Sequence, residues 1–111
     1  MTINEYQEAA LRTASSLNPD YPRILNGAMG LSGESGEVID MLKKHIFQGH
    51  DLDYNHVIKE LGDIAWYLAI TADAIGVDLE SVLRLNIEKL RNRYPDGFRI
   101  SDSVNRNSDD I

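Results

Sequence analysis

The chain contains no cysteine, which excludes disulfide bonds, thiolate nucleophiles and thiolate metal sites. Any metal site must therefore use oxygen or imidazole ligands. No stretch approaches the roughly 18 consecutive apolar residues of a membrane span, and the N-terminus lacks the basic start and apolar run of a signal peptide. We therefore expect a soluble, cytoplasmic protein without a membrane partner.

Basic residues are also scarce, since 11 Lys and Arg stand against 18 Asp and Glu and give a net charge of −7. No basic run could follow a nucleic-acid backbone, so polymeric nucleic acid is not an expected partner. A small phosphorylated ligand is still compatible, because bound cations would reverse the local field at its phosphates. The length suits one domain, which we expect at residues 1–100, followed by a loosely ordered polar tail at 101–111.

Strand signals are absent, and helical periodicity predicts an all-α fold of four to five antiparallel helices that associates into an oligomer. A capping box formed by Thr2 and Glu5 starts the first helix. The third predicted helix is apolar on every side over residues 64–70, which indicates a central helix or one covered by a second subunit. The helices are predicted at residues 2–16, 24–45, 53–75 and 79–94.

Glycines recur at every third position in the first part of the second predicted helix, and each lowers helix stability. We attribute them to close approach of a neighbouring backbone or ligand. The alternative is a loop that delays the start of this helix to Ser32. The glycines are Gly27, Gly30, Gly33 and Gly36.

Two acidic couplets with i, i+3 spacing are the most informative feature of the chain: Glu34 with Glu37, and Glu60 with Asp63. Residues three apart share one helix face, so each couplet projects two carboxylates in one direction. Both couplets border apolar positions. An unpaired carboxylate there loses part of its hydration, which costs on the order of several kcal/mol.

The stretch between the two couplets is long enough to complete one helix and bring the next one back antiparallel, so the couplets can face each other. Four such carboxylates repel strongly unless cations lie between them, and a hard divalent metal fits best. The alternative is a solvated acidic stripe with intrahelical salt bridges, in which Lys44 would pair with Asp40 or Glu37.

On the predicted fourth helix, Asn86, Lys89 and Arg93 lie along an apolar stripe at i, i+3 and i+7. They offer an amide for a base or sugar and two cations for phosphates, although positive charge near a helix C-terminus is also favourable by itself. We do not assign the histidines as ligands. Trp66 and Tyr67 are interpreted as core or interface residues.

These couplets, with residues 5–7, 30–37, 43–44, 48–50, 60–68 and 86–98, resemble the all-α nucleotide pyrophosphohydrolases of the MazG type. The resemblance covers nearly the whole chain. It implies Mg²⁺-dependent cleavage of a nucleoside triphosphate to the monophosphate and pyrophosphate by activated water, with Mn²⁺ as a substitute. It also implies a homodimer or homotetramer.

By motif position, the resemblance makes the four acids metal ligands: Glu34, Glu37, Glu60 and Asp63. The substrate contacts that it implies are Asn86, Lys89, Arg93 and Lys44. Our hypothesis is that one of the first two acids, Glu34 or Glu37, is also catalytic and orients the attacking water.

Two other readings of the acids remain. One is a non-catalytic helical dimerisation or regulatory module that retains a structural metal site. The other is a carboxylate-bridged di-iron bundle, which uses E-x-x-H couplets that are missing here. The sequence does not choose the base, the sugar or the number of metal ions.

Overall fold

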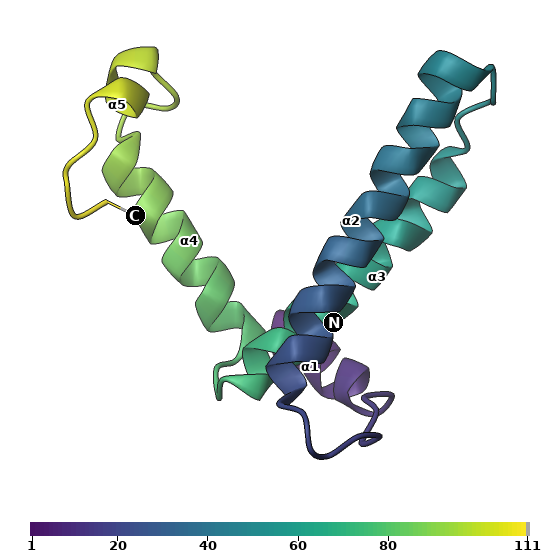
Figure 1. The fold of residues 1–111 in the computed structure, drawn as a ribbon. Helices are drawn as coiled ribbons and strands as arrows, with labels where there is room; N and C mark the ends of the chain where they lie inside the picture. The colour runs from purple at the N-terminus through teal and green to yellow at the C-terminus, as the bar shows by residue number, and fades with distance from the viewer. Residues whose placement is uncertain (111) are drawn as a thin grey trace. The chain divides into compact units, whose positions relative to one another are not determined.

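The computed structural model describes residues 1–110, and every regular element among them is a helix (Figure 1). The predicted all-α class is therefore confirmed. The described residues form two compact units, Met1–Leu79 and a second that begins at Glu80. The helices are α1 (Ile3–Leu11), α2 (Arg23–Gln48), α3 (Tyr54–Ala74), α4 (Leu79–Arg93) and α5 (Ile100–Val104).

The main feature of the first unit is the pair formed by α2 and α3, which pack along each other with α1 against α3 (Figure 1). A short connection makes the pair antiparallel. Gly49 ends α2 in the left-handed conformation, with φ of 72°, which glycine adopts without steric cost. Asp53 then starts α3, because its side chain accepts hydrogen bonds from the N–H groups of Asn55 and His56.

Several predicted boundaries are confirmed, including the Thr2 and Glu5 capping box and the start of α3 at its Asp53 cap. The predicted end of the first helix near Ser16 is wrong, because α1 ends at Leu11. The N–H groups of Arg12, Thr13 and Ala14 each donate to a carbonyl three residues back instead of four, and the carbonyl of Ala10 also accepts from the Trp66 indole at 3.1 Å. The loop alternative for residues before Ser32 is also wrong, since α2 begins at Arg23.

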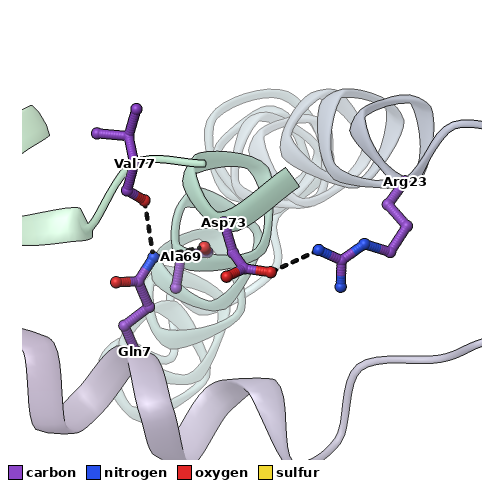
Figure 2. A network of polar contacts seen from close by, with 5 residues as sticks. All are labelled: Gln7, Arg23, Ala69, Asp73 and Val77. Carbon is purple, nitrogen blue, oxygen red and sulfur yellow. Dashed lines mark hydrogen bonds and ion pairs between the residues drawn. The ribbon is translucent and has the colours of Figure 1, made fainter. Parts of the chain in front are cut away.

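Gln7 fixes α1 against the end of α3 (Figure 2). Its side-chain amide donates to the carbonyls of Ala69 and Val77 at 3.2 and 3.3 Å. Its carbonyl oxygen accepts from the N–H of Leu79 at 3.0 Å. Because Gln7 is buried, these bonds satisfy its side-chain amide and give the buried N–H of Leu79 an acceptor.

A second polar contact joins the start of α2 to the last turn of α3 (Figure 2). The Arg23 guanidinium lies 2.5 Å from a carboxylate oxygen of Asp73, and both side chains are partly exposed. The pair holds the two helices together at the end opposite their connecting turn.

The first unit has a small core built around Ala10, Ala69 and Leu79, against which Tyr6 and Trp66 pack. Trp66 is thus confirmed as a core residue. Many large apolar side chains on α2 and α3 are exposed, among them Met29, Ile39, Ile46, Phe47, Ile58, Leu61 and Leu68. Among the described residues, no helix has the length and apolar character needed to cross a membrane.

The second unit contains most of α4, the turn that follows it and α5. The rings of Tyr94 and Phe98 pack across this turn with centroids 5.2 Å apart. Residues 101–104, which the sequence analysis placed in a loosely ordered tail, belong to α5. Further along the tail, Asp110 pairs with Arg93 at the end of α4.

Candidate metal centre

Two glycines bring α2 and α3 close together beside the acidic couplets. A Cβ atom at Gly27 would collide with the Thr71 side chain, and one at Gly30 would collide with the ring of Tyr67. The close approach predicted for the glycine series is therefore confirmed at these two positions. At Gly33 and Gly36 no neighbouring helix approaches, because an added Cβ atom would meet no atom within 4 Å among the described residues, and approach of a ligand there stays a prediction.

The pairing of α2 with α3 at these glycines continues along both helices to the acidic residues. Gly27, Gly30 and Glu34 share one face of α2, because they are separated by three and four residues. Their neighbours on α3 step backwards by similar amounts, from Thr71 and Tyr67 to the second couplet. The contact that positions the helices thus also positions the carboxylates.

Three of the four predicted acids converge. Glu34 of α2 and Glu60 and Asp63 of α3 each offer a carboxylate oxygen, and these oxygens lie within 4.8 Å of one another. Glu34 and Glu60 are half-buried, whereas Asp63 is exposed. Such a group can hold a metal ion, because carboxylate oxygens are the ligands that hard divalent cations prefer.

The electrostatics of this acidic trio, Glu34, Glu60 and Asp63, favour a proton or a cation between the carboxylates. The pKa of Glu34 is raised above its ordinary value of 4.5, first by a hydrogen bond with the Glu60 side chain, then by desolvation and the negative charges around it. Two carboxyl groups can share that bond only if one carries a proton.

Glu60 also has a carboxylate oxygen that is suited to bind a proton or a cation. Only 12% of its side chain is exposed, and its Oε2 atom is buried without a hydrogen-bond partner among residues 1–110 when both acids are ionised. Buried polar atoms normally have a hydrogen-bond partner, so this oxygen is a candidate to bind a cation.

His56 contacts the trio, although the sequence analysis gave it no role. Its Nε2 atom lies 3.1 Å from Oε1 of Glu60, one turn along α3. Asp53 holds the backbone N–H of His56 at the helix start, so the imidazole approaches Glu60 from a fixed turn. The i, i+4 spacing of His56 and Glu60 is the sequence signal that identifies this pair.

The remaining predicted acid, Glu37, stands apart from the trio. It is exposed and does not belong to the group of converging oxygens, although its charge contributes to the raised pKa of Glu34. Lys44 pairs with Asp40 at 2.8 Å, and this partner raises the pKa of the Lys44 ammonium. The intrahelical salt bridge weighed for Lys44 is thus present.

Tyr6 is a further neighbour of the second acidic couplet, and it was not predicted from the sequence. Burial against the core raises the pKa of its phenol, and the negative charge of Asp63 raises it further. Its ring therefore places part of α1 beside the second couplet. No residue spacing along the chain indicates this contact, because α1 and α3 are distant in sequence.

The predicted substrate residues of α4 belong to the second unit, which begins at Glu80. Asn86 and Lys89 are exposed. Arg93 is largely buried and is held by Asp110 through two hydrogen bonds of 2.6 Å. A cavity of about 590 Å³ lies beside this pair, with Lys89 and Arg106 also in its wall.

The fold and the trio define a helical protein with a carboxylate site suited to a divalent cation. Residues 25–98 match the MazG nucleotide pyrophosphohydrolase domain, and this stretch contains both acidic couplets. The chain belongs to the MazG nucleotide pyrophosphohydrolase family.

One relative is the "Gene 37 protein" of Mycobacterium phage L5. The two are 33% identical over 114 residues, which cover 96% of this chain and 100% of that protein. No solved structure matches the chain.

Proposed function

We propose that the chain is a Mg²⁺-dependent pyrophosphohydrolase that cleaves a ribo- or deoxyribonucleoside triphosphate to the monophosphate and pyrophosphate. The observation that carries the proposal is the convergence of Glu34, Glu60 and Asp63 around a buried Glu60 oxygen that lacks a partner among the described residues. Membership of the MazG family supports the class of reaction.

The donor set fits a hard cation. At Mg–O distances of about 2.1 Å, two ligand oxygens lie at most about 4.2 Å apart, so small side-chain rotations suffice to bring oxygens within 4.8 Å onto one ion. Mn²⁺, which takes the same ligands, should substitute. When bound, the cation would neutralise charge on the polyphosphate and make a coordinated water more acidic.

Three residues around the metal site have separate roles in this proposal. His56 engages Oε1 of Glu60, which leaves Oε2 for the cation. Glu37 is exposed one turn along α2 from Glu34, outside the trio. We assign Glu37 to orienting the attacking water and accepting its proton, because a carboxylate that is not consumed as a ligand keeps both oxygens for that role.

The substrate would be held by α4, with Lys89 and Arg93 binding phosphates and Asn86 binding the base or sugar. Two cations on one helix would neutralise part of the charge of a polyphosphate. Lys44 on α2 is the fourth residue of the predicted set. Arg93 and Lys44 are each paired with a carboxylate in this structure, so each would have to exchange that partner for a phosphate group.

Pyrophosphate release from canonical and damaged nucleotides, with Mg²⁺ or Mn²⁺, tests the proposal. Wild type should release pyrophosphate, and Glu60→Gln should lose this activity. Glu37→Gln should lower turnover by about 10²- to 10⁴-fold, the usual contribution of a general base, while Glu8→Gln serves as an exposed control.

Two outcomes would contradict these assignments. Unchanged turnover in Glu37→Gln would remove Glu37 from the mechanism. A non-catalytic module that retains a structural metal site would bind Mg²⁺ but release pyrophosphate from none of the nucleotides.

We also propose that the chain associates with copies of itself as a homodimer or homotetramer. The support is the number of large apolar side chains that α2 and α3 leave exposed, among them Ile39, Phe47 and Ile58. A second copy would cover them symmetrically. Light scattering at micromolar concentration should give at least the mass of a dimer, and a monomer would contradict the proposal.

A further inference from the structure

The end of α4 is occupied by the chain's own tail. Arg93 donates from Nε and from a terminal guanidinium nitrogen to the two carboxylate oxygens of Asp110, both at 2.6 Å. The two side chains are only 10% and 17% exposed, so the pair is well shielded from water. A guanidinium held in this way by a carboxylate has the geometry that it also offers to a phosphate group.

Three cations and three acids line the cavity of about 590 Å³ beside this pair, and they are Lys89, Arg93, Arg106, Asp102, Asp109 and Asp110. The three cations all lower the pKa of Asp110, with the hydrogen bond from Arg93 as the largest cause. Two of the acids, Asp109 and Asp110, belong to the tail, so a displaced tail would leave the three cations facing Asp102 alone. A ligand with more negative charge and more acceptor oxygens than a carboxylate would therefore gain additional partners here.

The tail turns back on itself to present the acid. The N–H of Asp110 donates to the carbonyl of Asn107 at 2.9 Å, and the N–H of Asp109 donates to the Asn107 side chain at 3.2 Å. This local turn lies on a short segment after α5, so it can swing away without unfolding a helix.

We propose that the pocket of Lys89, Arg93 and Arg106 is a phosphate-binding site and that Asp110 is its built-in competitor. The tail must release Arg93 before a phosphate group can bind there. That this phosphate belongs to the nucleotide substrate rests on the proposed function, whereas the competition itself does not.

Binding of pyrophosphate to the full chain, measured by calorimetry in EDTA, tests the competition. Apparent affinity scales with the fraction of molecules whose site is free, so a tail that is closed in nine molecules of ten weakens binding about tenfold. Asp110→Asn should therefore bind pyrophosphate roughly tenfold more tightly than wild type. Asp109→Asn is the matched control, since it removes the same charge from the adjacent residue. Arg93→Lys, which loses the bidentate fork, should bind weakly.

A second measurement uses the wild-type chain and needs no variant to fold. Saturating pyrophosphate should shift the backbone amide signals of residues 107–110 in NMR spectra and give them the relaxation of a mobile segment. The proposal is overturned if these signals stay unchanged. It is also overturned if Asp110→Asn binds pyrophosphate no better than Asp109→Asn, because the ion pair is then only a staple for the tail.

The two proposals fail separately. If the wild type hydrolyses no nucleotide but Asp110→Asn still binds pyrophosphate more tightly, the hydrolase assignment fails and the competitor stands. If nucleotides are hydrolysed and the tail does not respond to pyrophosphate, only the competitor fails.

Discussion

Replacing Glu60 with Gln should change stability in opposite directions without and with Mg²⁺. In EDTA, wild type leaves Oε2 of Glu60 buried without a partner among the described residues. An unsatisfied buried group costs about 1–3 kcal/mol. The side-chain amide introduced by Glu60→Gln can donate to the Glu34 carboxylate, which lies within hydrogen-bonding reach. Glu60→Gln should therefore be about 1–3 kcal/mol more stable, which raises Tm by about 4–8 °C per kcal/mol in a domain of this size.

Mg²⁺ should reverse the order. An ion that binds only the folded chain at 1,000 times its Kd stabilises it by about 4.1 kcal/mol, which exceeds the advantage of Glu60→Gln in EDTA. Wild type should gain this increment, whereas Glu60→Gln has lost an anionic ligand and should gain little.

Thermal melts followed by circular dichroism, in EDTA and in Mg²⁺, measure both effects. Glu37→Gln is the matched control, because Glu37 is exposed and lies outside the trio. Its stability in EDTA should differ little from wild type, within about 0.5 kcal/mol, and it should keep the Mg²⁺ response. The reasoning is refuted if Glu60→Gln melts below wild type in EDTA, or if Mg²⁺ raises both by the same amount.

Three further predictions follow from described contacts. The pKa of Glu34 is raised above 4.5 in the folded state, so protonation of Glu34 stabilises the folded chain below pH 4.5. This stabilisation is lost as the pH rises through the folded-state pKa. Urea titrations in EDTA from pH 4 to 8 should show the fall in stability in wild type but not in Glu34→Gln. Gly30→Ala should cost about 1–3 kcal/mol through collision with Tyr67, whereas Gly36→Ala should stabilise α2 by up to about 1 kcal/mol, both measured by urea unfolding; equal effects would contradict the close approach. Gln7→Leu should cost about 1–3 kcal/mol by leaving the buried N–H of Leu79 unsatisfied, and hydrogen exchange at this amide should accelerate; an unchanged exchange rate would show that the amide has another acceptor.

Helical periodicity and caps predicted most of the fold because those signals are local. Asp53 caps α3 through its own side chain, and the glycine at position 49 ends α2 by its own conformation. The end of α1 was mispredicted because the apolar spacing continues past Leu11, whereas the backbone there changes to hydrogen bonds three residues back. The role of Gln7 depends on backbone groups at the far end of α3.

The acidic site shows the same division. The i, i+3 spacing placed Glu60 and Asp63 on one face of α3, and both converge with Glu34. The same spacing did not separate Glu37 from Glu34, because three residues on a helix differ by about 60° in direction. Only the packed partner helix determines which of the two points inward. The contact between Asp110 of the tail and Arg93 was also not predicted, because no sequence pattern around Asp110 indicates its partner.

The glycine contacts of α2 have a consequence for ion preference. Since Gly27 and Gly30 govern the spacing of the helix pair, a bulkier residue at either position would widen the gap between opposing carboxylates without altering a single ligand. Larger ions such as Ca²⁺, with oxygen distances of about 2.3–2.6 Å, would then fit better than Mg²⁺. Residues that do not contact the ion, such as Gly27 and Gly30, can therefore determine which hard cation the site prefers.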